Sequence, residues 1–268
     1  MIGPSRMQKA RGFLHLGTKD GHELVIESFT NLSAELQAEA IKSTDHGGKA
    51  DAPSRYALIA ASTHFVTGKL LDIFVKLEMV DWMNRELSVL PYGENDQYRI
   101  YMGLAVKDFH VDVFSLLDSL ASAVALASRG LYSENNQRLP GWSTIQLRKS
   151  DTQGIQRQNL AEDLCKLMDS TNSWLPAVTQ IRDVLKHRDR LSLIAVDPSD
   201  GILFQLPGWT RPTPVLESVL LDSKLTDVVD FELYSAFVSA EILALLNELG
   251  LRMAAHLGVK LRTESLSM

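Results

Sequence analysis

An eleven-residue segment, 180–190, concentrates the side chains of this chain that could do chemistry. It reads Gln-Ile-Arg-Asp-Val-Leu-Lys-His-Arg-Asp-Arg, with four basic side chains, two carboxylates and one histidine. An arginine presents a planar fork of donors to a phosphate. A histidine exchanges protons near neutral pH. Together they are the minimum that metal-free cleavage of RNA requires.

Each side chain of the segment has a role in this hypothesis. Arg182 would bind a phosphate oxygen and stabilise the negative charge that develops as the phosphorus is attacked. His187 would take a proton from a ribose 2′-hydroxyl or give one to the leaving oxygen. Asp183 would orient one of these two groups. The RNA-binding cations would be Lys186, Arg188 and Arg190, which hold flanking phosphates. No metal ion and no other cofactor is needed.

The spacing of Arg182 and His187 restricts how they can act together. On a continuous helix, five residues turn through about 500°, so the two side chains lie ~140° apart. They reach one ligand only if the helix ends or bends between them, or if a homodimer brings two copies together. A purely structural role is the alternative, because cations in a last helical turn complement the helix dipole. In that case we expect Arg182 to pair with Asp183, Asp189 or another carboxylate.

An arginine, then a polar residue, then a histidine four to six positions after the arginine, in a helical bundle, resembles the HEPN superfamily. The matching residues here are Arg182, Asp183 and His187. Asn is often found at the polar position of that family, and Asp or His sometimes. The resemblance implies a dimeric, metal-independent endoribonuclease of the kind found in toxin–antitoxin, abortive-infection and other defence systems. Arg182 and His187 would be catalytic and Asp183 would assist. Because many HEPN-like proteins are inactive, the alternative is a non-catalytic helical protein that binds a protein partner or a small ligand.

A second group of polar residues is Asp108, His110 and Asp112. Asp108 and Asp112 share a helical face, whereas His110 points ~200° away, so we expect no metal site from these three. Asp112 and Asp118 lie close to an apolar stripe. We expect one of them to be partly buried and paired with an arginine.

Composition limits the class of protein. The 268 residues are 45% hydrophobic, which is enough for a substantial core. The net charge is −6, from 27 Lys and Arg against 33 Asp and Glu, so RNA would have to bind at a local basic patch. The one cysteine, Cys165, cannot form an internal disulfide, and we expect it to be buried. The first residues lack a signal-peptide core, and no run reaches ~18 uncharged apolar residues. We therefore expect a cytoplasmic protein with no membrane contact.

Apolar residues repeating every three or four positions predict long helices. These cover about 54–87, 96–129, 156–186 and 227–256. Pro176 should bend or split the third helix, and Gly258 should end the fourth. A shorter helix is expected at 31–42.

Strand patterns are short. Alternation within 11–29 around Asp20-Gly21 predicts a hairpin. A second hairpin is predicted from 191–196 and 202–206, with a third short strand at 215–221.

We therefore predict a mainly α fold, an antiparallel bundle of four long helices with small β-hairpin elements. Residues 1–50 would form an N-terminal hairpin and short helix. Residues 51–268 would form the bundle domain, with a β insertion around 191–221. We expect a homodimer, with RNA or a cognate protein as its partner.

Overall fold

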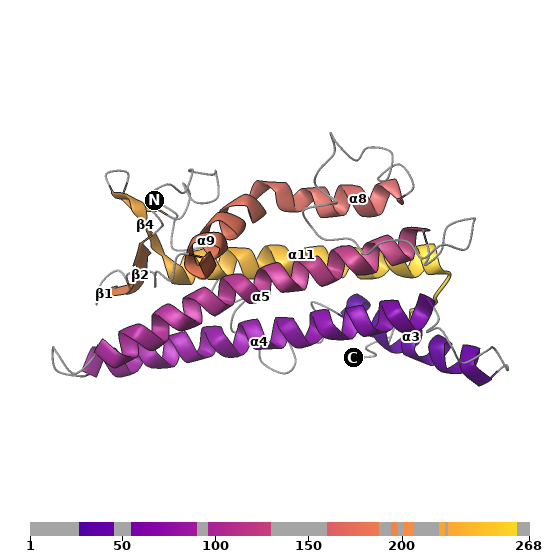
Figure 1. Cartoon of the computed structure of the whole chain (residues 1–268), viewed down its shortest axis with the longest axis horizontal. Helices are drawn as coiled ribbons and strands as arrows, with labels where there is room; N and C mark the ends of the chain where they lie inside the picture. Colours follow the sequence, from indigo (N-terminus) through magenta and orange to yellow (C-terminus); the bar gives the residue numbers. More distant parts are fainter. Residues whose placement is uncertain are drawn as a thin grey trace, which may run out of the picture. The chain divides into compact units, whose positions relative to one another are not determined.

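The computed structural model describes residues 27–45, 55–89, 96–129, 160–187, 194–197, 201–205, 220–222 and 225–261. This part of the chain is mainly helical with one small sheet, as predicted (Figure 1). The predicted hairpin around Asp20-Gly21 lies outside the described residues. Residues 27–29, which were predicted to belong to that β region, are helical instead.

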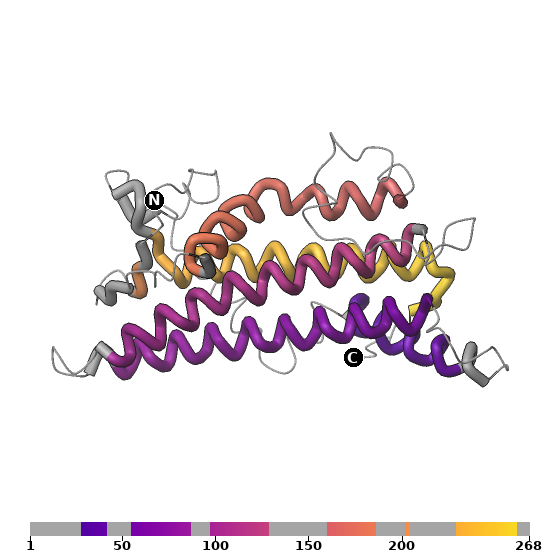
Figure 2. The backbone as a smooth tube through the Cα atoms, in the orientation of Figure 1, coloured from indigo at the N-terminus to yellow at the C-terminus, as the bar shows by residue number. Residues whose placement is uncertain are grey.

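The long helices begin and end close to their predicted bounds. The described helices include α3 (Glu27–Asp45), α4 (Arg55–Val89), α5 (Asp96–Arg129) and α11 (Phe231–Leu257). Figure 2 traces them in chain order. α3 is longer than predicted at both ends. α5 matches the prediction at both ends, because its apolar stripe is continuous from one terminus to the other.

The third predicted helix is split, as Pro176 suggested. It consists of α8 (Glu162–Asp169), the 3₁₀ turn η1 (Ser170–Ser173) and α9 (Leu175–His187). Pro176 is the second residue of α9. Its missing N–H costs nothing there, because the first amides of a helix have no acceptor within the helix.

The fourth helix starts later than predicted. Residues 227–230 belong to the strand β4 (Leu225–Asp230), and α11 begins at Phe231. Val228 and Val229 are β-branched and pair across the sheet with Gln205 and Phe204. The Asp230 carboxylate then accepts a hydrogen bond from the Leu233 amide at 3.1 Å, as an N-cap does.

The sheet has four antiparallel strands in the order β1-β2-β4-β3. Its remaining strands are β1 (Ile194–Asp197), β2 (Gly201–Gln205) and β3 (Leu220–Asp222). The predicted hairpin of β1 and β2 is confirmed. Of the third predicted strand, residues 220–221 belong to β3, which pairs with β4, and residues 215–219 lie outside the described residues.

The end of α11 has the form expected of its glycine. Gly258 has φ 66°, a conformation that favours glycine. The amide of Gly258 donates to Ala255 at 3.2 Å, and the amide of Val259 donates to Ala254 at 2.9 Å. These two bonds form a Schellman motif.

The described residues divide into two compact units. The first unit contains the described residues within Lys69–Ser115 and Thr171–Glu241. The second unit contains those within Lys19–Gly68, Leu116–Ser170 and Ile242–Met268. The boundaries cut across α4, α5 and α11. In the first unit, Phe109 packs edge-on against Phe231 at 5.7 Å between ring centroids. In the second, Ser28 of α3 donates to the Asn247 carbonyl of α11 at 2.8 Å.

Three helical segments are long and apolar enough to cross a membrane, judged by length and composition alone. They are Arg55–Glu86, Gln97–Ser128 and Phe231–Leu257. The prediction from uncharged runs did not identify them, because each can include a few charged residues and still be apolar on average.

Candidate functional site

The candidate site is built on α9. Its apolar residues are buried on one side, among them Ile181, Val184 and Leu185. Arg182 lies beside this buried face, and its side chain is only 14% exposed. A guanidinium held this close to the core needs partners, because removing a charge from water is costly.

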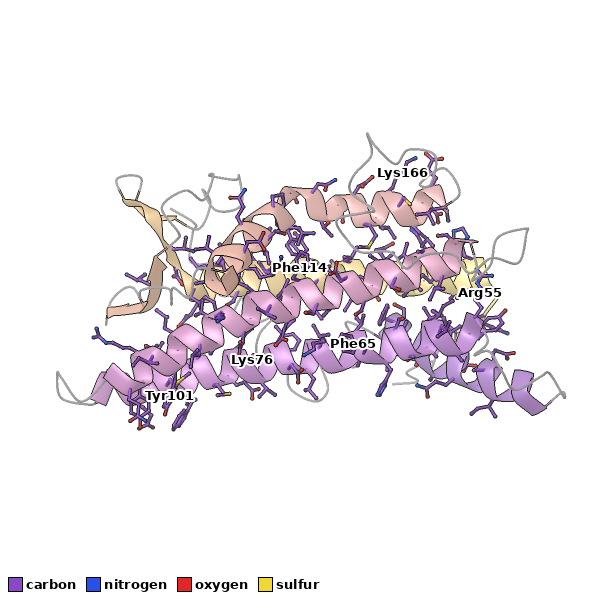
Figure 3. All side chains as sticks on the ribbon, viewed as in Figure 1. Arg55, Phe65, Lys76, Tyr101, Phe114 and Lys166 are labelled. Carbon is purple, nitrogen blue, oxygen red and sulfur yellow. The ribbon has the colours of Figure 1, made fainter. Side chains whose placement is uncertain are left out.

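Arg182 finds two partners within the first unit. Its Nε donates to Oδ1 of Asp183 at 2.9 Å, and its Nη2 donates to the same oxygen. Its Cζ lies 3.7 Å from the centre of the Phe114 ring on α5. Phe114 is labelled in Figure 3 between α5 and α9. One face of the guanidinium is therefore stacked, and two of its five N–H donors are bonded to Asp183.

The two proposed catalytic residues lie on one unbroken helix. α9 runs continuously from Leu175 to His187, so the backbone neither ends nor bends between Arg182 and His187. The two backbone positions are therefore ~140° apart around the helix axis, so the helix by itself does not bring them together.

The other candidate residues have different outcomes. Asp183 is 42% exposed and bonds Arg182, as both hypotheses allow. The side chains of Lys186 and His187 lie outside the described residues, as do Arg188 and Arg190 entirely.

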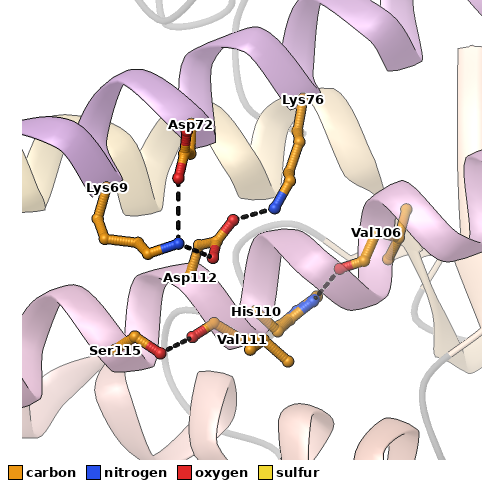
Figure 4. A network of polar contacts seen from close by, with 8 residues as sticks. All are labelled: Lys69, Asp72, Lys76, Val106, His110, Val111, Asp112 and Ser115. Atoms are coloured by element: carbon orange, nitrogen blue, oxygen red, sulfur yellow. Dashed lines mark hydrogen bonds and ion pairs between the residues drawn. The ribbon is translucent and has the colours of Figure 1, made fainter.

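A second polar cluster lies where α4 meets α5, and Figure 4 shows it. The Asp112 side chain is only 7% exposed. It accepts hydrogen bonds from Lys69, at 3.1 Å, and from Lys76. Lys69 also donates to Asp72 at 3.0 Å, and the hydrogen bonds to Asp72 and Asp112 raise the pKa of Lys69. Of the two aspartates predicted to include a buried and paired one, Asp112 is buried and paired, but its partners are lysines and not an arginine. Lys69 and Lys76 lie on the same face of α4, about two turns apart, so both can reach one carboxylate from opposite sides.

His110 is fully buried and forms hydrogen bonds through both ring nitrogens. Nδ1 lies 2.7 Å from the Val106 carbonyl, which can only accept, so Nδ1 carries the proton. The Tyr234 hydroxyl then donates to Nε2 at 3.1 Å. Burial lowers the pKa of His110 to about 4 and raises the pKa of Tyr234. His110 is thus a neutral core residue. The described residues contain no group of His, Cys, Asp and Glu that could hold a metal ion.

The sequence did not reveal two of these contacts. Phe114 is 68 positions before Arg182 in the chain, so no local pattern links the two residues. The hydrogen bond between the Tyr234 hydroxyl and His110 likewise cannot be predicted from apolar periodicity. Both pairings depend on how separate helices pack.

Comparison with known proteins gives no match: no family model, no curated protein and no solved structure matches this chain.

Proposed function

We propose that this chain is a non-catalytic helical binding protein, in which the Arg182 segment stabilises the fold and does not cleave RNA. One observation carries the proposal. The Arg182 guanidinium is stacked on Phe114 and bonded to Asp183, with 14% of its side chain exposed. A phosphate could reach only the remaining N–H donors of a side chain that is largely covered and already neutralised by Asp183.

The competing proposal is the HEPN-like ribonuclease. Since Arg182 and His187 diverge along α9, it requires a homodimer in which Arg182 of one copy meets the partner's His187. On RNA binding, Arg182 would either lose its bond to Asp183 or keep it while contacting the phosphate. The second option agrees with the predicted role of Asp183 in orienting Arg182. The ribonuclease and the non-catalytic protein therefore have to be separated by experiment.

The experiment measures stability and RNA cleavage on the same proteins. Arg182→Ala should lower the free energy of unfolding by about 2 kcal/mol, because it removes a buried cation–π contact and a charge-assisted hydrogen bond. Arg85→Ala is the matched control. Arg85 is 69% exposed and pairs with Asp81, and surface pairs of this kind contribute ~0–1 kcal/mol.

Each protein, together with His187→Ala, is incubated with mixed RNA in EDTA. We expect no cleavage by the wild-type chain and none by any variant. Cleavage by wild type and Arg85→Ala that is lost in Arg182→Ala and His187→Ala, with all four proteins folded, would overturn the proposal and establish the ribonuclease.

We further propose that the long helices form an antiparallel bundle. Within the first unit, Lys69 of α4 meets Asp112 of α5, and Trp82 of α4 meets Tyr98 of α5, with 6.1 Å between the latter ring centroids. The pairing of later α4 residues with earlier α5 residues is the pattern of antiparallel helices.

We propose a cytoplasmic location. On α4, Asp72 and Asp81 have side chains that are 52% and 61% exposed. Carboxylates facing hydrocarbon would oppose insertion of this helix by about 3 kcal/mol each. Fractionation of cells that express the chain tests this, with recovery in the membrane pellet after a carbonate wash as the contrary result.

A further inference from the structure

The first unit exposes a large apolar patch on α4 and α5. We define the α4–α5 patch as the large hydrophobic residues of these two helices, within the first unit, that are 41–61% exposed: Leu71, Val75, Met79, Trp82, Ile100, Tyr101 and Leu104. The α4 members recur every three or four residues, so they form a stripe. Tyr101 is labelled in Figure 3 near the joined ends of α4 and α5.

The two stripes form one surface. At ~100° per residue, the α4 stripe lies on average about 115° around α4 from Lys69 and Lys76, which contact Asp112. The α5 members of the patch lie on average about 75° around α5 from Asp112. Viewed from the N-terminus of each helix, the patch residues are displaced from the contact residues in the same rotational direction. In two antiparallel helices that face each other, displacements in the same direction place both sets of residues on the same side of the pair.

The patch is large enough to form a protein interface. Its exposed fractions add up to about three and a half whole side chains, or ~700 Å² at ~200 Å² for each. The largest apolar patch of a typical monomer is ~300–600 Å². A standard interface buries ~800 Å² on each partner. Two such patches facing each other would therefore bury an area close to that of a stable dimer.

The charges around the patch do not oppose self-association. Residues 69–86 and 97–112 carry six carboxylates and five basic side chains, so this face is nearly neutral although the chain has a net charge of −6. A strongly basic partner would find little complementary charge here. A second copy would place mixed charges against mixed charges at the rim, as protein interfaces commonly do.

We infer that the α4–α5 patch is the surface through which two copies of this chain associate, with the two helix pairs packed face to face. This inference goes beyond the proposed binding function and is independent of it. Phe114, which supports Arg182, lies ~200° around α5 from Asp112 and therefore faces away from α4. Association through the patch would not bring the two α9 helices together, as the ribonuclease would need.

The test is sedimentation equilibrium of the full chain over the micromolar range. The wild type should have twice the chain mass of 29.8 kDa. The double variant Val75→Glu/Met79→Glu should sediment as a monomer or dissociate at least about tenfold more readily, because buried charges at the centre of an interface lack partners. The control is Leu251→Glu, at a side chain on α11 that is 49% exposed and outside the patch, which should remain a dimer.

Circular dichroism verifies that each variant is folded, and Leu71→Ser/Trp82→Ser replaces the double glutamate variant if that one unfolds. A wild-type monomer at ~100 μM would overturn the inference, as would a dimer that survives the patch substitutions. A monomer that binds vesicles of anionic phospholipid through the same residues would also overturn it, and would identify a lipid surface as the occupant.

Discussion

Two helical glycines should respond to alanine with opposite signs. Gly250 lies in α11 where α3 crosses it. A Cβ built there would lie 2.6 Å from the Phe29 nitrogen, and 2.8 Å from the Phe29 Cα and from the Ser28 carbonyl carbon. Gly68 lies in the exposed face of α4, and a Cβ there meets nothing within 4 Å. The two sites share one helical backbone conformation and differ in what surrounds them.

The magnitude follows from this difference. Alanine in a helix interior is about 1 kcal/mol better than glycine, so Gly68→Ala should stabilise the chain by that amount. At Gly250 the same gain is opposed by a contact about 0.8 Å closer than the 3.4 Å of ordinary packing. Overpacking costs about 1–3 kcal/mol. We take the upper value, because the contacted atoms belong to the backbone and cannot move away by a change of rotamer. The free energy of unfolding should therefore fall by about 2 kcal/mol.

Urea unfolding followed by circular dichroism measures both variants. We expect free energies of unfolding that differ by about 3 kcal/mol, with Gly68→Ala above the wild type and Gly250→Ala below it. The loss should come with disturbed packing of Phe29, which is fully buried. If Gly250→Ala is as stable as Gly68→Ala, the close approach of α3 to α11 is refuted.

Two further predictions concern the buried polar groups. The pKa of His110 falls from its ordinary 6.5 to about 4 on folding, so the unfolded chain binds a proton between these values and the folded chain does not. Protonation of His110 in the unfolded chain therefore costs no stability above about pH 6.5, and it lowers the free energy of unfolding by up to about 3 kcal/mol as the pH falls toward 4. Urea unfolding at a series of pH values should show this decrease. His110→Gln should make it smaller. Asp112→Asn should destabilise the chain by about 2–3 kcal/mol, because Lys69 and Lys76 lose a buried counter-charge, whereas Asp72→Asn, at an exposed carboxylate, should cost less than about 1 kcal/mol. Equal losses in the two asparagine variants would contradict the central role of Asp112.

The helix bounds were accessible from sequence because they depend on local signals. Apolar periodicity predicted α4 and α5 closely, and Gly258 marked the end of α11. The start of α11 was wrong by four residues. Helical periodicity extended smoothly into Val228 and Val229, and only pairing with β2 made these residues a strand. Local preference cannot decide such a segment, because strand pairing depends on residues far away in the chain.

The amino-acid sequence alone determined which segments are helical, where Pro176 breaks them, and that Arg182 and His187 would diverge on a continuous helix. Those properties depend on a few neighbouring residues and on fixed backbone geometry. The tertiary structure decided the partners: Phe114 beneath Arg182, two lysines around Asp112, and Tyr234 on His110. It also decided that Leu71, Val75 and Met79 remain exposed while other apolar residues of α4 are buried. The physical reason is that burial and pairing of a side chain depend on which helix packs against it, and packing joins residues that the chain keeps far apart.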